Sequence, residues 1–155
     1  MNKPCPFCGP NIKVATFSET ENFLAIYNIA PILPGHSLVI PKEHVQSFLD
    51  LSDSELCELV IFSRRTVKLL LEVFKVKSFN WLIQDGEVAG QSIPHFHLHL
   101  IPRKQGDTPH PGDWYPMLEQ KKTEIIDSDS RPKFNDVEMK SIVERIRQTE
   151  IELGI

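Results

Sequence analysis

The sequence predicts an α+β fold, in which an antiparallel sheet of about five strands carries one long helix and a C-terminal helix. Three observations support this class. Short β-prone runs end at prolines or turn residues, one long segment has apolar residues at helical spacing, and a second helical pattern lies near the C-terminus. A chain of 155 residues can bury its own core, so we expect a single domain over 1–155.

The first part of the chain predicts three strands. Two β-prone runs, 12–17 and 22–27, flank the polar segment 18–21, which is the pattern of an antiparallel hairpin. A third strand is expected at 37–40. Pro41 should end it, because proline has no N–H to donate to a neighbouring strand.

The middle of the chain predicts the long helix. Ser52 and Glu55 have the spacing of a capping box, and apolar residues follow at helical intervals from Leu56 to Phe74. Charged residues interrupt the most apolar stretch, 56–76, so we do not expect it to lie in a membrane.

Two more strands and a helix are expected in the second half. A β-prone run at 79–84 leads into an Asp-Gly turn, and a final strand is expected at 96–102. Prolines without periodic spacing mark 105–133 as a long loop, which we expect to be mobile. Apolar residues from Val137 to Ile146 then indicate the C-terminal helix.

Composition argues against several functional classes. With 17 basic and 21 acidic residues, the formal charge of −4 is opposite to that of a general nucleic-acid binder. The N-terminal residues lack the apolar run of a secretory signal, so a cytoplasmic or nuclear location is expected. Three cysteines also argue against a secreted disulfide framework.

Three histidines alternate in the region of the final strand: His95, His97 and His99. Strand side chains have a period of two, so the imidazoles are expected on one face, opposite Phe96 and Leu98. Imidazole suits phosphoryl chemistry, because its neutral form is a nucleophile near pH 7 and its protonated form stabilises anionic oxygen. Two alternatives remain open, a polyhistidine metal site and a solvated polar strand face.

The segments that flank these histidines make the sequence recognisable. GQSIP at 90–94 precedes them, IPRKQGD at 101–107 follows them, and PGHSLVIP at 34–41 forms an earlier block. Together these motifs resemble the histidine-triad superfamily, and 84–107 is most similar to its fragile-histidine-triad branch, the dinucleoside polyphosphate hydrolases. The resemblance covers most of the chain and implies a homodimer, with the sheet extended by dimerisation.

The resemblance also implies an activity. Dinucleoside polyphosphates of the diadenosine tri- or tetraphosphate type would be cleaved at the α-phosphate through a covalent nucleotidyl intermediate on His97. Zinc is the one cofactor implied; no organic cofactor, nucleic acid or membrane partner is expected. The resemblance assigns phosphate or leaving-group contacts to His36, His99, Gln91 and Ser92, and nucleotide contacts to Asn28, Ile26, Gln84 and Tyr115.

Two other functions remain open at this point. A purine nucleoside phosphoramidase would use the same nucleophile to cleave a P–N bond, and Ser92 is compatible with it. A nucleotide-binding signalling module would hydrolyse its nucleotide slowly and would signal while the nucleotide is bound.

Several of the assigned residues also fit an ordinary structural interpretation. Asn28 and Gln84 fall at strand ends, where a polar residue often simply ends a sheet, and His36 after Pro-Gly fits a turn. Tyr115 fits a packing or surface aromatic equally well. Arg103, with the following lysine, fits either a solvated basic pair or part of the polyphosphate path.

Two cysteines near the N-terminus, Cys5 and Cys8, admit two interpretations. A Cys-Pro-aromatic-Cys loop also occurs in redox sites, but those need a helix starting at the second cysteine, which Gly9-Pro10 disfavours. The other interpretation is zinc. Many microbial members of the superfamily have a ligand at the position of His44, and His95 supplies the fourth. Such a site would be closed, tetrahedral and structural.

The third cysteine, Cys57, lies inside the predicted long helix. It is expected to be an ordinary core or semi-exposed thiol.

Overall fold

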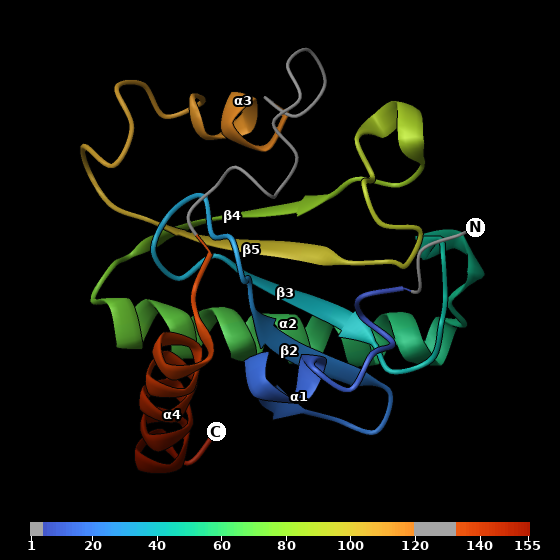
Figure 1. The fold of residues 1–155 in the computed structure, drawn as a ribbon, viewed down its shortest axis with the longest axis horizontal. Coiled ribbons are helices and arrows are strands. Elements are labelled where there is room, and N and C mark those ends of the chain that lie inside the picture. The colour runs from blue at the N-terminus through green and yellow to red at the C-terminus, as the bar shows by residue number, and fades with distance from the viewer. Residues whose placement is uncertain (1–4, 120–132) are drawn as a thin grey trace.

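In the computed structural model, which describes residues 5–119 and 133–155, five strands form one antiparallel sheet in the order β1-β2-β3-β5-β4 (Figure 1). The α+β class predicted from the sequence is therefore confirmed. The strands are β1 (Thr16–Glu19), β2 (Phe23–Tyr27), β3 (Ser37–Pro41), β4 (Ser78–Ile83) and β5 (Leu98–Arg103).

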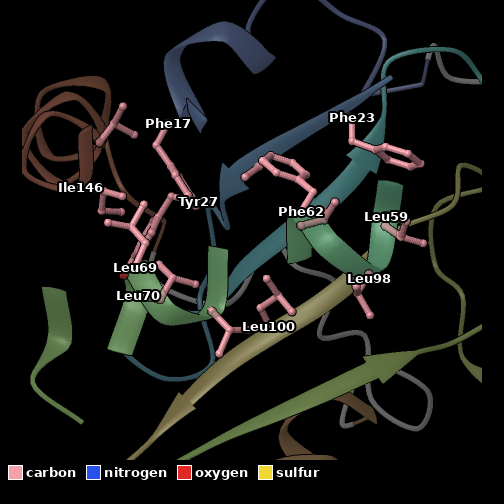
Figure 2. Close-up of a cluster of buried hydrophobic side chains, with 14 of the residues drawn as sticks. Phe17, Phe23, Tyr27, Leu59, Phe62, Leu69, Leu70, Leu98, Leu100 and Ile146 are labelled. Carbon is pink, nitrogen blue, oxygen red and sulfur yellow. The ribbon is translucent and has the colours of Figure 1, made fainter. Parts of the chain in front are cut away.

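One long helix, α2 (Asp53–Phe74), packs its apolar face on the sheet. Its capping box is present: Ser52 Oγ accepts the Glu55 N–H at 3.3 Å, and the Glu55 carboxylate accepts the Ser52 N–H at 2.8 Å. Figure 2 shows the side chains of α2 that meet those of β5 in the core; these are Leu59, Phe62, Leu69 and Leu70 from the helix and Leu98 and Leu100 from the strand. Most of the apolar residues that the sequence places at helical spacing therefore face the sheet, as predicted.

The C-terminal helix α4 (Asp136–Leu153) closes the same core. Asn135 caps it, with its side-chain oxygen accepting the N–H groups of Val137 and Glu138. Ile146 of α4 lies close to Phe17 and Tyr27, as Figure 2 shows.

Of residues 12–17, predicted as a strand, the first four instead form one helical turn, α1 (Ile12–Ala15), and only Thr16 and Phe17 belong to strand β1. The turn sends Ile12 and Val14 into different apolar clusters on the two faces of the sheet. Partial burial of both side chains therefore outweighs the β propensity of the run.

The final strand begins later than predicted, at Leu98 rather than residue 96. The Phe96 N–H donates to Val45 O at 2.7 Å, so this residue pairs with the loop after β3. The short 3₁₀ helix η1 (Phe48–Asp50) follows in that loop. The alternation of side chains nevertheless holds, because Phe96 and Leu98 enter the main core while the histidines between and beside them face the other way.

Part of the predicted loop 105–133 is helical. Helix α3 (Trp114–Glu119) packs through Leu118 and Met117 against Ile101 of β5, on the face of the sheet opposite α2. Residues 120–132 lie outside the described residues, so the expected mobility of the loop stays a prediction.

Within 5–119 and 133–155, no helix is long and apolar enough to cross a bilayer.

Candidate active site

Two histidines meet in the middle of the sheet. His36 directly precedes β3, and His99 lies on β5 opposite Leu38 of β3. Nε2 of His36 is 2.9 Å from Nδ1 of His99, and the side chains are 0% and 6% exposed. His36 is thus a buried member of a histidine pair, which excludes the interpretation as a residue that only decorates a turn.

The backbone sets the tautomers of this pair. The Ile32 N–H donates to Nδ1 of His36 at 3.3 Å, so in the neutral ring the proton is on Nε2. That nitrogen then donates to Nδ1 of His99. A neutral His99 consequently carries its own proton on Nε2, as a hydrogen-bond donor.

His97 has the opposite tautomer. Its Nδ1 lies 2.8 Å from the backbone oxygen of His95. A carbonyl oxygen can only accept, so Nδ1 carries the proton and the neutral ring has its lone pair on Nε2. The ring lies 5.0 Å from that of His99, centroid to centroid, and is 4% exposed. A nucleophilic nitrogen and a donor nitrogen therefore belong to neighbouring rings.

Asn28 and Gln84 lie on either side of the pair formed by His36 and His99. Asn28 Nδ2 is 3.4 Å from Nε2 of His36, and its Oδ1 accepts the Ala30 N–H at 3.0 Å. Gln84 directly follows β4, is buried, and donates from Nε2 to Ala89 O at 3.2 Å. A Cβ added at Gly90 would lie 2.2 Å from that same Nε2, so a glycine is required there.

Gln91 links two loops through both ends of its side-chain amide. Its Oε1 accepts the Gly86 N–H at 2.7 Å, and its Nε2 donates to Gln46 O at 2.8 Å. Asp85 also joins these two loops, because its carboxylate accepts the Phe48 N–H at 2.7 Å. Gln91 and Asp85 therefore hold the two loops together beside the site. Ser92, the next residue, is exposed.

Ile26 and Tyr115 both belong to the histidine face of the sheet. Ile26 is buried in a cluster with Leu38 and Ile40, and Leu38 is paired with His99. Tyr115 is on α3, which covers Ile101 of the same face, and its ring packs edge-on against Trp114 at 5.7 Å. Their expected contacts with a nucleotide stay predictions.

Arg103 is neither a solvated residue nor free to bind phosphate. All five of its N–H donors are used, with distances of 2.7 to 3.0 Å; the acceptors are the Asp107 carboxylate, Asn80 Oδ1, Pro111 O and Thr108 Oγ1. The hydrogen bonds from Arg103 lower the pKa of Asp107 to about 2. This group therefore anchors the chain between β5 and α3, a role that charge alone does not reveal in the sequence.

A second cluster lies at the start of the histidine row, where the N-terminal segment reaches β5 (Figure 1). The four predicted metal ligands Cys5, Cys8, His44 and His95 place their ligand atoms within 4.8 Å of one another. Cys8 Sγ is 3.3 Å from Nδ1 of His44, and both sulfurs are 3.5 Å from Nδ1 of His95. Tetrahedral Zn²⁺ with thiolate and imidazole ligands has S···N edges of about 3.6 Å, so the geometry fits zinc.

The orientation of His95 also fits metal binding. Its Nε2 donates to Pro41 O at 3.0 Å, which leaves the lone pair on Nδ1, the atom that faces the sulfurs. Burial lowers the pKa of His95, which favours the neutral ring that a metal requires. The redox alternative lacks its helix, because α1 starts at Ile12 and not at Cys8.

Phe7 is a residue of the site that the sequence reasoning missed. It lies between the two cysteines, and its ring is 5.6 Å from that of His95 and 5.5 Å from that of His97. The available signal was its position between two candidate ligands, which keeps its backbone close to the cluster.

Comparison with known proteins supports a family assignment. A family model described as the HIT domain matches residues 10–106. The asymmetrical bis(5'-nucleosyl)-tetraphosphatase of Schizosaccharomyces pombe is 45% identical over 91 residues, which cover 59% of this chain and 50% of that protein. The bis(5'-adenosyl)-triphosphatase of Dictyostelium discoideum is 35% identical over 127 residues, which cover 77% of this chain and 85% of that protein. The chain thus spans half the length of the first relative and most of the second.

A solved structure agrees with this assignment. The crystal structure of a zinc-bound histidine triad family protein from Mycobacterium smegmatis has a TM-score of 0.71 at 25% identity, with 97% of this chain and 95% of that chain covered. The match of fold, the family model and the motifs around the three histidines all point the same way. This chain belongs to the HIT domain family, as its sequence motifs predict.

Proposed function

We propose that this protein hydrolyses dinucleoside polyphosphates of the diadenosine tri- or tetraphosphate type at the α-phosphate, with His97 as the nucleophile. The names of the two relatives, at 45% and 35% identity, support this substrate class. The observation that carries the proposal is the hydrogen bond of 2.8 Å from Nδ1 of His97 to the backbone of His95. It leaves the nucleophilic lone pair on Nε2.

The reaction would proceed by two displacements. Nε2 of His97 forms a bond to the α-phosphorus while the bond from phosphorus to the bridging oxygen breaks and the second nucleotide leaves. Water then attacks the same phosphorus, the P–N bond breaks, and His97 is restored. Division into two steps replaces one difficult displacement with two easier ones.

The neighbouring histidines would stabilise charge during both steps. Nε2 of His99 is a donor because His36 donates to its other nitrogen, and the ring lies 5.0 Å from that of His97. A donor held beside the nucleophile stabilises the negative charge that grows on phosphate oxygens. His36 acts by holding the donor tautomer of His99.

The remaining predicted contacts surround these rings. Asn28 would hold the ribose beside His36, Ile26 would form an apolar wall for the base, and Gln84 would donate to the phosphates. Tyr115 would reach the phosphates from α3. Ser92 is exposed and fits the leaving group, whereas Gln91 would have to exchange both of its backbone hydrogen bonds to contact it.

We also propose that Cys5, Cys8, His44 and His95 hold a structural zinc ion. The distances and the orientation of His95 support this, and the related Mycobacterium smegmatis protein is zinc-bound. Zinc would tie the N-terminal segment to the start of β5 and contribute to folding stability.

A homodimer that extends the sheet is a further part of the proposal. β4 ends the strand order of the sheet, and its side chains Phe79 and Trp81 are 44% and 38% exposed. An edge strand with exposed apolar side chains is a ready surface for pairing with a second copy. Analytical ultracentrifugation should give twice the mass of one chain, and the mass of one chain would contradict the dimer.

Comparing kcat/KM for diadenosine triphosphate, diadenosine tetraphosphate and an adenosine phosphoramidate tests the activity. We expect the dinucleotides to be preferred by at least about tenfold, because the extended phosphate chain adds contacts in the transition state. A reversed preference would assign the site to a P–N hydrolase. Tight binding of all three compounds with negligible turnover would instead favour a signalling module.

A further inference from the structure

Phe7 connects the metal-binding cluster to the proposed nucleophile. It lies in the loop between Cys5 and Cys8, and its ring packs edge-on against both His95 and His97, with interplanar angles of 89° and 67°. The same ring belongs to the apolar cluster of Ile26, Leu38 and Ile40 on the histidine face. One side chain of the cysteine loop therefore lines the site where the chemistry is proposed.

The orientation of His97 needs more than its hydrogen bond. Rotation about the Cβ–Cγ bond of histidine has broad energy wells, so one hydrogen bond from Nδ1 leaves the direction of Nε2 loosely defined. The ring of His97 is contacted by Phe7 at 5.5 Å and by His99 at 5.0 Å. Packing by these two rings restricts the rotation and so aims Nε2.

We propose that Phe7 is a positioning residue for His97, and that the Cys5/Cys8/His44/His95 cluster holds Phe7 in place. Metal binding at this cluster would then restrict the orientation of the His97 ring and of its Nε2 atom. The inference rests on the proposed function only in taking His97 as the nucleophile. Its structural part, that Phe7 and the cysteine loop order the ring of His97, can be measured without any substrate.

The loop geometry explains why the metal matters to this contact. The turn from Cys5 to Cys8 is closed by a backbone hydrogen bond of 3.2 Å, and the sulfurs on both sides of Phe7 face Nδ1 of His95. A metal held by both cysteines fixes the two ends of a three-residue step, and the side chain between them has little freedom left. Without the metal, the two cysteines are held to His44 and His95 by weak thiol contacts.

The first experiment substitutes the ring. Phe7→Leu keeps an apolar side chain in the cluster but removes the aromatic edges, and Phe7→Tyr restores the ring. With zinc bound, we expect kcat for diadenosine triphosphate to fall about tenfold in Phe7→Leu, with KM changed less than about twofold, because an ill-aimed nucleophile slows the chemical step. Phe7→Tyr should recover most of the loss.

The matched control is Ile12→Ala. Ile12 packs in the same cluster of Ile26, Leu38 and Ile40 but comes from α1, beyond the cysteine loop. Its truncation disturbs the cluster without removing a ring from His97, so kcat should stay within about twofold of the wild-type value. A loss of kcat equal to that of Phe7→Leu would overturn the positioning role.

The second readout needs no turnover. Long-range ¹H–¹⁵N NMR of ¹⁵N-histidine protein reports the tautomer of each ring, and zinc-loaded wild-type protein should show His97 in a single form with the proton on Nδ1. A ring that rotates away loses the hydrogen bond from Nδ1 to the His95 backbone oxygen, so Phe7→Leu, and wild-type protein after zinc is chelated, should both show a mixture of tautomers. Chelation of Phe7→Leu should add little, because the two changes act through the same contact.

The outcomes separate the two proposals. Unchanged His97 signals in Phe7→Leu would overturn the inference, and identical signals with and without zinc would overturn its link to the metal. If the His97 signals change in Phe7→Leu but the wild-type protein hydrolyses no dinucleotide, the positioning role is supported and the proposed function is rejected. If Phe7→Leu does not fold, Phe7→Met, which fills the volume without a ring, serves in the same comparison.

Discussion

His95 and His97 are two residues apart and share one face, yet they present opposite nitrogens to their surroundings. Nε2 of His95 donates to Pro41 O, so its lone pair on Nδ1 faces the sulfurs of Cys5 and Cys8. His97 donates from Nδ1 to the backbone of His95, so its lone pair is on Nε2. In both cases a backbone carbonyl selects the tautomer, and the tautomer decides whether the ring suits a metal or a phosphorus atom.

Because His95 and His97 have different partners, we expect substitutions at His97, the catalytic end of the histidine row, and substitutions in the metal-binding cluster, its metal end, to have separate effects. The largest expected effect is at the catalytic end. His97→Asn should retain nucleotide and zinc binding but lose turnover by roughly 10⁴-fold or more, because the amide offers no nucleophilic nitrogen. Steady-state kinetics, isothermal titration with a nucleotide and zinc analysis measure the three properties.

The control for that variant is the same substitution at an exposed position. His110→Asn changes a histidine in the segment before α3 and should keep turnover within about twofold. Near-normal turnover of His97→Asn would break the comparison at its catalytic end.

At the metal end the expected effect is on stability. Cys8→Ser should lose bound zinc and, at zinc concentrations about 1,000 times Kd, about 4 kcal/mol of stabilisation. For a chain of this size that lowers the unfolding midpoint by roughly 10 °C. Differential scanning calorimetry with elemental analysis gives both values.

Cys57→Ser provides the matched change. Cys57 is an exposed cysteine on α2, outside the four-residue cluster. The Cys57→Ser protein should keep its bound zinc and its thermal unfolding midpoint. If elemental analysis of wild-type protein purified without chelator finds no zinc, the structural zinc proposal is removed.

The smallest expected effect concerns the support of Gln84 at the catalytic end. Gly90→Ala should lower kcat/KM about tenfold without loss of zinc, because the new Cβ would overlap the Gln84 amide at 2.2 Å and displace it. Gly86→Ala is the control, since Gly86 also has a positive φ of 87° but nothing lies within 4 Å of an added Cβ. Both glycines have a positive φ, and alanine is strained at least as much at Gly86 (φ 87°, ψ 153°) as at Gly90 (φ 102°, ψ 4°). Equal losses of kcat/KM would therefore show that strain, not Gln84, is responsible.

Much of the fold could be predicted because local signals and burial agree. Ser52 and Glu55 form the expected capping box, and the alternation of Phe96 and Leu98 puts apolar side chains in the core. The two largest errors in strand boundaries have a tertiary cause. Ile12 and Val14 belong to two different apolar clusters, and Phe96 pairs with the loop residue Val45. A local sequence pattern shows neither of these contacts.

The candidate site was predictable in its residue types but less so in its contacts. The cluster of Cys5, Cys8, His44 and His95 was expected from the resemblance to the superfamily, whereas the hydrogen bond between His36 and His99 was not. The bridging role of Gln91 and the ring contacts of Phe7 depend on where separate loops meet in space. Such meetings are set by the packed fold as a whole, so spacing within the chain does not reveal them.

The most direct test of the account is to look for the nucleotidyl group on His97 during a single turnover. Protein in excess over diadenosine triphosphate is quenched at alkaline pH across the whole time course, digested and analysed by mass spectrometry. We expect a transient adenylyl group on the peptide that contains His97, formed and lost at rates that match substrate consumption and product release. Complete turnover with no modified peptide, or with the group on another residue, would contradict it.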